Sequence, residues 1–165
     1  MEAIINEFIH YLRNFVEKPN KLFSNLPVCP FAKQARLDNR IKFCICDLND
    51  IPKDKIPLLS KESVLWFIHP EKDFDQLKLE EISVNLSKEF TTFDFFTGHP
   101  ESQIFYRREP HPNILVQNVD FLNEKRAILK KTKYYEYMSI TSDVEKSIKS
   151  NTSNFSQNES NGTSE

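Results

Sequence analysis

A continuous run of five apolar residues, Val64-Leu-Trp-Phe-Ile68, constrains the fold of this chain more than any other feature. Turn-forming residues flank the run, and its length is typical of a strand rather than a helix. Because a strand without a polar side is buried on both faces, the run predicts a strand inside the protein. It is also far too short to cross a membrane, which takes about 20 residues. We therefore expect no association with a membrane.

Elements with weaker signals lie on both sides of this run. Apolar residues at helical spacing predict four helices, at 2–17, at 30–36, in a segment that ends at Phe90, and at 119–138. Asp73 or Asp75 is the expected N-cap of the third of these helices. Alternating or short apolar runs predict further strands at 41–45 and 92–97, with weaker candidates at 104–106 and 113–116. This order predicts the fold class α+β. We expect a two-layer sandwich in which helices pack on a small mixed β-sheet of about four strands.

Chain length and tail composition predict the domain organisation. The 165 residues fit one domain, which we place at residues 1–140. Of the 16 residues from Ser150 to Glu165, 11 are Ser, Thr or Asn. Such a segment buries too little apolar surface to offset the entropy of ordering it. We therefore expect residues 141–165 to form a disordered Ser/Asn-rich tail.

Glycine content and charge exclude two classes of function. The chain has two glycines, Gly98 and Gly162, whereas loops that cradle phosphates need several. No nucleotide cofactor is therefore expected. Residues 1–140 carry 20 basic and 20 acidic side chains, and such a neutral body argues against general nucleic-acid binding.

The cysteines and the first residues bear on location. The segment Met1-Glu-Ala-Ile-Ile-Asn-Glu-Phe8 has no basic region of the kind that begins a signal peptide. Three cysteines without such a signal predict reduced thiols in the cytoplasm. Cys44 and Cys46 point to the same side of a predicted strand, and we expect them to pack in the core.

Proline follows an unusual share of the reactive side chains. Three of four histidines precede a proline, at His69, His99 and His111, and so does Cys29. Proline restricts the backbone of the residue before it, which holds these four side chains at the ends of elements. Such placement is typical of a functional site. In the alternative, prolines merely end strands and the histidines happen to precede them.

Cys29 has the clearest possible chemistry. With Pro30 as the first helical residue, Cys29 would be the N-cap and would face unpaired backbone N–H groups. These groups and the helix dipole favour a thiolate, so the sequence predicts a lowered pKa and a nucleophile, a redox thiol or a metal ligand. The alternative is a small apolar side chain buried beside Phe31.

The histidines and arginines complete the candidate site. His69 and His99 end predicted strands, and both would lie at one edge of the sheet if the strands run parallel. Arg107 and Arg108 are candidates for binding an anionic substrate group, because guanidinium groups bind carboxylate or phosphate in a bidentate manner. The alternative is an exposed loop in which the arginines pair with Glu101 and Glu109.

Four segments resemble an uncharacterised bacterial family, domain of unknown function 1415. They are Val28-Cys-Pro-Phe-Ala-Lys33, Val64-Leu-Trp-Phe-Ile-His-Pro70, Gly98-His-Pro100 and Arg108-Glu-Pro-His-Pro112, in the order seen in that family. The match spans roughly residues 5–135. The resemblance implies that Cys29, His69, His99 and Arg108 are the family's motif residues, and that this chain is a shortened, divergent relative.

The chain departs from the family at the last motif. His111 stands where the family has tyrosine, Glu109 where it has serine, and Arg107 where it has asparagine. The segment from His99 to Arg108 is also shorter than in typical members. The resemblance therefore implies a shared site but no particular reaction, and the short segment argues against a substrate-covering loop.

Three functions follow from these residues. In the first, the protein is an enzyme acting on a small anionic substrate, with Cys29 as thiolate nucleophile or redox centre, His69 or His99 as acid–base group, and Arg108 as anion anchor. In the second, Cys29, His69 and His99, with or without His111, bind zinc or iron. In the third, the protein is a non-catalytic interaction module, and it lacks a pocket near Cys29.

Overall fold

The computed structural model describes residues 1–21, 25–132 and 134. The predicted tail at 141–165 lies outside the described residues. The centre of the fold is a four-stranded mixed sheet with the order β3-β4-β6-β5. Its strands are β3 Ile41–Ile45, β4 Val64–Ile68, β5 Phe93–Gly98 and β6 Asn113–Asn118. Strands β3 and β4 are parallel, and β6 runs antiparallel to both β4 and β5. The α+β class and the mixed four-stranded sheet are confirmed.

Strand β4 has the environment that its apolar sequence predicts. All five of its residues are buried, because neighbouring strands flank it and helices lie over both of its faces. Side chains alternate along the strand: Trp66 and Ile68 enter one core, and Leu65 and Phe67 enter the other. The sheet therefore separates two hydrophobic cores.

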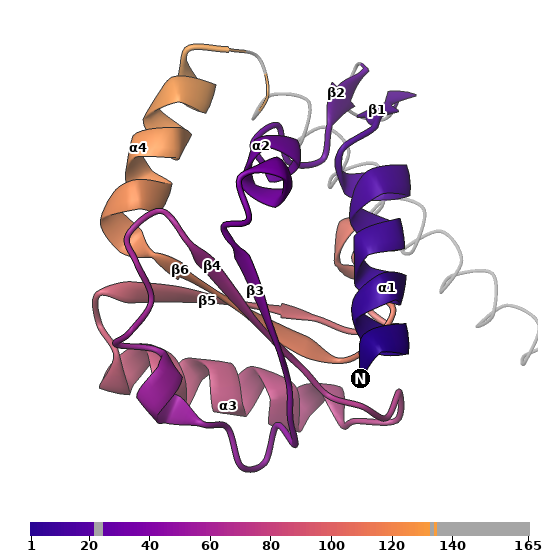
Figure 1. Cartoon of the computed structure of the whole chain (residues 1–165), viewed down its shortest axis with the longest axis vertical. Helices are drawn as coiled ribbons and strands as arrows, with labels where there is room; N and C mark the ends of the chain where they lie inside the picture. Colours follow the sequence, from indigo (N-terminus) through magenta and orange to yellow (C-terminus); the bar gives the residue numbers. More distant parts are fainter. Residues whose placement is uncertain (22–24, 133, 135–165) are drawn as a thin grey trace, which may run out of the picture.

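Helix α3, Gln76–Glu89, covers the first face of the sheet (Figure 1). The Asp75 carboxylate caps it by accepting hydrogen bonds from the backbone N–H groups of Leu77 and Lys78. The helix buries Leu79 and Leu86 against the sheet, in a core to which Cys44 and Cys46 also pack. The predictions of a cap at Asp75 and of core packing for these two cysteines are confirmed.

Three helices cover the second face. They are α1, Glu2–Tyr11, which continues through a π-helical turn at Leu12–Val16, α2, Ala32–Leu37, and α4, Val119–Lys130. Figure 1 shows these helices on the opposite side of the sheet from α3. The sheet is thus the middle of three layers, and the predicted two-layer arrangement accounts for only one of its faces. A short antiparallel ribbon, β1 Pro19–Asn20 with β2 Leu26–Pro27, links α1 to α2.

Two local predictions are wrong. Residues 104–106 do not form a strand; Phe105–Arg107 is a 3₁₀ turn, and the Phe105 ring packs edge-on against Phe15 at 6.4 Å instead of joining the sheet. Helix α2 begins at Ala32 rather than at Pro30, because Pro30 and Phe31 form a turn that leads into the helix. In the part of the chain that the structure describes, no helix combines the length and the apolar character that crossing a membrane requires.

Candidate functional site

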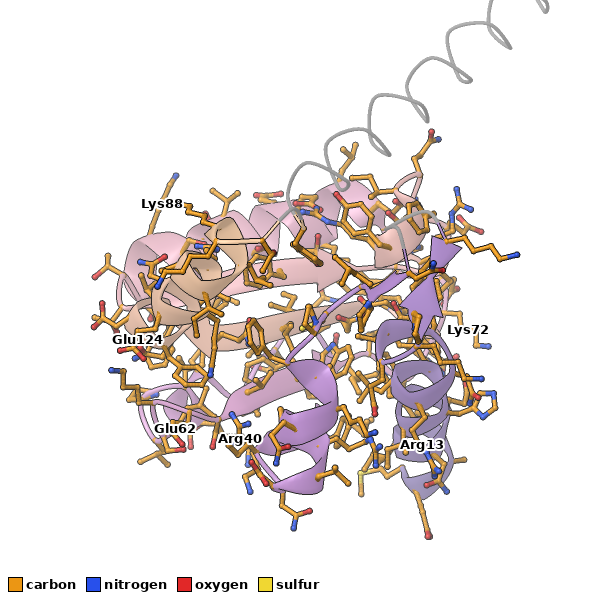
Figure 2. All side chains as sticks on the ribbon, turned by 90° about the horizontal axis from the view of Figure 1, so that it is seen from above. Arg13, Arg40, Glu62, Lys72, Lys88 and Glu124 are labelled. Carbon is orange, nitrogen blue, oxygen red and sulfur yellow. The ribbon has the colours of Figure 1, made fainter. Side chains whose placement is uncertain are left out.

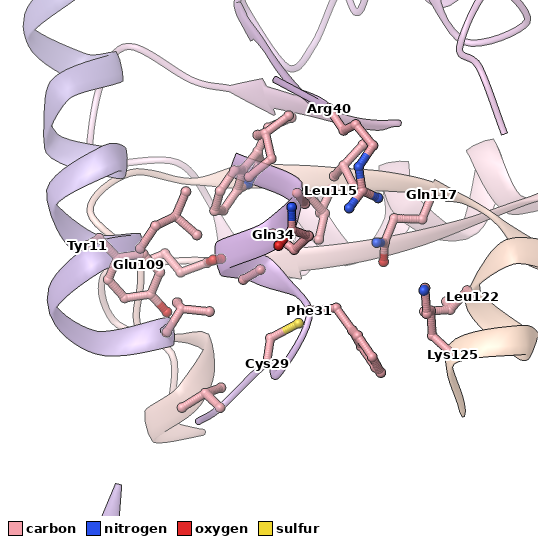
Figure 3. A pocket seen from close by; sticks show the side chains of 18 of the residues that line it. Tyr11, Cys29, Phe31, Gln34, Arg40, Glu109, Leu115, Gln117, Leu122 and Lys125 are labelled. Carbon is pink, nitrogen blue, oxygen red and sulfur yellow. The ribbon is translucent and has the colours of Figure 1, made fainter. Parts of the chain in front are cut away.

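A cavity of about 300 Å³ lies on the second face of the sheet, among α1, α2, α4 and the strands. Its walls are mainly apolar and include Leu12, Trp66, Leu115 and Phe121. Figure 3 shows the polar side chains that interrupt these walls, which include Tyr11, Cys29, Gln34, Arg40, Glu109 and Lys125. A cavity of this size, apolar with a few polar groups, has the usual character of a small-molecule site.

The loop before α2 holds Cys29 in the cavity wall. The backbone N–H of Cys29 donates to the Val16 carbonyl at 3.3 Å, and the Tyr134 hydroxyl donates to the Val28 carbonyl. The backbone at Phe31 and Ala32 favours the Cys29 thiolate, and the Ala32 N–H donates to the Cys29 carbonyl at 3.3 Å. The prediction that Cys29 is the N-cap is wrong: Phe31 occupies that position, and Cys29 precedes the helix by three residues.

The predicted lowering of the Cys29 pKa is wrong. Burial of the thiol raises its pKa, and the backbone at Phe31 and Ala32 opposes this effect only in part. The physical reason is that a thiolate loses more solvation in an apolar wall than the backbone restores. At neutral pH the folded protein therefore holds Cys29 as a thiol.

Glu109 is the second reactive group in the cavity. Burial raises the pKa of this carboxyl to about 7, against the opposing effects of the Asn113 hydrogen bond and the Arg107 charge. The carboxyl packs directly over Gly98, where an added Cβ would overlap it. Burial and the Glu109 charge also raise the pKa of Tyr11, which lines the same cavity.

A chain of buried hydrogen bonds from Trp66 through Asn113 holds the Glu109 carboxyl in place. Trp66 Nε1 donates to Asn113 Oδ1 at 2.6 Å, and Asn113 Nδ2 donates to Glu109 Oε2 at 2.9 Å. The same Nδ2 also donates to the His111 carbonyl at 2.9 Å. Asn113 is only 1% exposed. Its amide orientation is therefore set by the indole, and its N–H groups must face Glu109 and the backbone.

Two cationic side chains line the cavity: Lys125 lies on α4, and Arg40 lies between α2 and β3. Lys125 Nζ stands 5.0 Å from the ring centroids of both Phe31 and Phe121. Arg40 donates through Nη1 to the Glu62 carbonyl at 3.2 Å, and its Nη2 lies 3.5 Å from Asp38. Figure 2 shows Arg40 and Glu62 at the same side of the molecule. These cations are candidates for binding the anionic part of a ligand.

His69 and His99 lie at one edge of the sheet, as predicted, since β4 and β5 both run antiparallel to β6. Both meet Phe74, a residue of the core beneath α3: the His69 ring lies edge-on to it at 4.8 Å, and His99 Nε2 donates to its carbonyl at 2.6 Å. The Leu48 N–H donates to His69 Nδ1, and the Glu101 N–H donates to His99 Nδ1. The sheet therefore separates both histidines from Cys29.

Arg108 and His111 also lie apart from the cavity lining. The Arg108 guanidinium donates to the Ser102 carbonyl at 2.8 Å and to the Gln103 carbonyl at 3.3 Å, and so holds its own loop. His111 is 4% exposed and packs beside the Phe8 ring. Neither of its ring nitrogens has a hydrogen-bond partner, although Glu7 Oε2 lies 3.3 Å from Nε2.

The structure thus divides the predicted site. Cys29 lines the cavity, and His69, His99, Arg108 and His111 do not. Within residues 1–21, 25–132 and 134, no three His, Cys, Asp or Glu side chains are grouped so as to hold a metal ion. The predicted ligand set of Cys29, His69 and His99 does not converge and does not fit zinc or iron.

Sequence reasoning missed Glu109 as a cavity residue and named it only in one alternative, as a partner of the arginines in an exposed loop. No local signal marks it, because its burial depends on Gly98, eleven positions earlier, lying beneath it. Comparisons of the chain with protein-family models, curated proteins and solved structures give no match. The resemblance to domain of unknown function 1415 stays a prediction.

Proposed function

We propose that this protein is a thiol-dependent enzyme whose cavity binds a small organic acid and presents it to Cys29. One observation carries the proposal: the Cys29 sulfur enters a mainly apolar cavity of about 300 Å³ that also has cationic side chains in its wall. Cys29 also packs against the core of the second face, but packing alone does not account for open space and cationic side chains beside its sulfur.

Cavity size and lining define the ligand class. The volume accommodates roughly ten to fifteen non-hydrogen atoms, if each takes the space of about one water molecule or slightly less. Apolar walls favour a hydrocarbon or aromatic body. Lys125 and Arg40 favour a carboxylate at one end, because charge-assisted hydrogen bonds are strongest where water is excluded.

The environment of Cys29 suits a thiol that ionises only during reaction. Burial keeps the free site protonated, and the backbone at Phe31 and Ala32 is in place to stabilise the charge that develops on the sulfur. Arg40 and Lys125 take the anion-binding role that the sequence suggested for Arg108. An interaction module was expected to lack a pocket near Cys29, so the cavity favours the enzyme over that alternative.

A ligand screen tests the proposal directly. Benzoates and medium-chain carboxylic acids are titrated into the protein, and binding is followed by the fluorescence of Trp66, the single tryptophan, which lines the cavity. We expect several acids to bind, Lys125→Met to weaken binding about tenfold, and Cys29→Ala to change the affinities because the sulfur lines the cavity.

Lys88→Met is the matched control, since Lys88 lies on α3 across the sheet from the cavity. It should bind each acid as the wild type does. Equal weakening in both lysine variants would show a nonspecific charge effect. Binding that Lys125→Met leaves unchanged, or affinities that Cys29→Ala leaves unchanged for every acid, would contradict the proposal.

A further inference from the structure

We infer that Glu109 is the acid–base residue of the cavity and that the substrate is a carboxylic acid with a carbonyl group at its opposite end. This inference rests on the proposed function. Figure 3 shows the Glu109 carboxyl and the Cys29 sulfur pointing toward the same part of the cavity. A carbonyl carbon is the natural target of the sulfur, and its oxygen is the natural partner of a carboxylic acid.

Asn113 holds one side of the Glu109 carboxyl. Within the described residues it is the hydrogen-bond donor to this group, and its bond goes to Oε2. The carboxyl therefore keeps Oε1 for a ligand. Since Trp66 donates to Asn113 Oδ1, a flip of the amide would break that bond and turn an acceptor toward Glu109. Asn113 is thus a positioning residue for Glu109.

Gly98 gives the carboxyl its place against the sheet. It lies opposite Asn113 in the β5–β6 pairing, and a Cβ at this position would overlap the Glu109 carboxyl and lie 2.7 Å from Asn113 Nδ2. The one glycine among residues 1–140 thus stands where the carboxyl meets the backbone. Close approach of a functional group is a recurring reason for glycine in a strand.

The first chemical step follows from these groups and needs no other reactant. Cys29 Sγ forms a bond to the carbonyl carbon as the C=O π bond breaks, and the carboxylic acid of Glu109 gives its proton to the oxygen. The S–H proton then replaces it on Glu109. Addition of a thiol across a carbonyl gives a hemithioacetal, with no net oxidation or reduction. A carboxyl with a pKa of about 7 exchanges protons readily in both directions near neutral pH.

Two benzoates test this inference separately from the proposed function. 4-Formylbenzoate carries an aldehyde opposite its carboxylate, and 4-methylbenzoate has the same ring and carboxylate without the carbonyl. Binding is measured by Trp66 fluorescence, and the adduct is followed by NMR of 4-formylbenzoate labelled with ¹³C at the aldehyde. We expect the wild type to bind 4-formylbenzoate about tenfold more tightly and to form a hemithioacetal, which Cys29→Ala does not form.

Variants of Glu109 and Asn113 complete the test. Glu109→Gln should slow adduct formation by about a hundredfold and leave the affinity for 4-methylbenzoate within about twofold. Asn113→Asp keeps an acceptor for Trp66 and places a second carboxylate beside Glu109, so the pH midpoint of adduct formation should rise by about one unit or more. An unchanged midpoint would contradict the contact between Asn113 and Glu109.

The outcomes distinguish the two claims. If both benzoates bind equally, or if Glu109→Gln forms the adduct as fast as the wild type, the inference about Glu109 is overturned while the anion-binding cavity stands. If neither benzoate binds, the proposed function fails and the inference fails with it.

Discussion

Trp66 donates a hydrogen bond from Nε1 to Asn113 Oδ1 across the pairing of β4 and β6, over a distance of 2.6 Å. Both residues are almost fully buried, so neither group has water as a substitute partner. The bond joins the central strand, recognisable from its apolar sequence, to Glu109, which no local pattern identified. It connects the stability of the sheet to the geometry of the cavity.

Replacing Asn113 by Ala should destabilise the protein by about 2–4 kcal/mol. The change leaves the buried Trp66 N–H without an acceptor and the Glu109 carboxyl without its donor. Each unsatisfied group costs about 1–3 kcal/mol. Urea unfolding followed by Trp66 fluorescence measures the loss. Asn6→Ala, at an exposed position on α1, is the control and should stay within about 0.5 kcal/mol. Equal stability of the two variants would contradict the buried network.

The stability of the wild type should decrease as the pH rises from about 4.5 to about 7. The pKa of Glu109 is raised from the ordinary 4.5 to about 7, so in this window the folded state binds a proton that the unfolded state releases. At 1.36 kcal/mol for each pKa unit, the contribution lost is about 3 kcal/mol. Glu109→Gln removes the titration, so the difference in unfolding free energy between variant and wild type should shift by that amount in favour of the variant. A difference that is constant with pH would contradict the raised pKa.

Cys29 should react slowly with iodoacetamide at pH 7. Because burial raises its pKa, its alkylation should accelerate only at a pH above the ordinary thiol range of about 8.5. Mass spectrometry separates this site from Cys46, whose pKa of about 12 also predicts slow reaction. The same protein in urea is the control, and there all three cysteines should react alike. Faster reaction of Cys29 than of a free thiol at pH 7 would support the thiolate expected from the sequence.

Arg36 and Glu17 join α2 to the end of the π-helical turn through two 2.8 Å hydrogen bonds. Glu17→Gln should cost about 2–3 kcal/mol at pH 7, since the Glu17 side chain is 6% exposed and the pair is bidentate. The Arg36 hydrogen bond lowers the pKa of Glu17, so the stabilisation is present above the ordinary carboxyl pKa and is lost as the pH falls through the lowered one.

Glu89→Gln is the matched control for this pair, because Glu89 forms an exposed ion pair with Lys53 at 2.9 Å. Its cost should stay below about 1 kcal/mol. Urea unfolding at pH 7 and at pH 3 measures both variants. A Glu17 variant that matches the Glu89 variant at both values would show that the α2 connection adds nothing.

His111→Phe should leave the protein as stable as the wild type or more stable by about 1 kcal/mol. Both nitrogens of the buried imidazole lack hydrogen-bond partners, and a phenyl ring fills the same space beside Phe8 without that cost. His111→Ala should instead lose about 2–4 kcal/mol, because it leaves a cavity. Thermal unfolding compares the two variants. Strong destabilisation by Phe would show that the approach of Glu7 Oε2 to His111 Nε2 at 3.3 Å is a stabilising polar contact.

Local physical chemistry made much of the fold predictable. The apolar run at 64–68, the alternation at 41–45 and the Asp75 cap each depend on residues within one or two turns or one strand, and the structure confirms all three. The prediction of a strand at 104–106 was wrong because the apolar side chains of this segment fit a strand pattern and a packed turn equally well. The contact that favours the turn is made by Phe15, which lies 90 positions before Phe105 in the sequence.

The candidate site shows the same division. From the sequence alone, Cys29 is expected at a helix N-cap, and His69 and His99 are expected at one edge of a sheet. The structure confirms the edge for both histidines, but the helix begins later and Phe31 is its N-cap. Only the tertiary structure decided that the histidines lie beneath α3 while Cys29 lies on the other face. The sequence of a strand shows which side chains share a face, but not which helices cover that face. Burial likewise set the protonation of Cys29 and Glu109, since desolvation depends on distant segments that cover a group and not on its neighbours in the sequence.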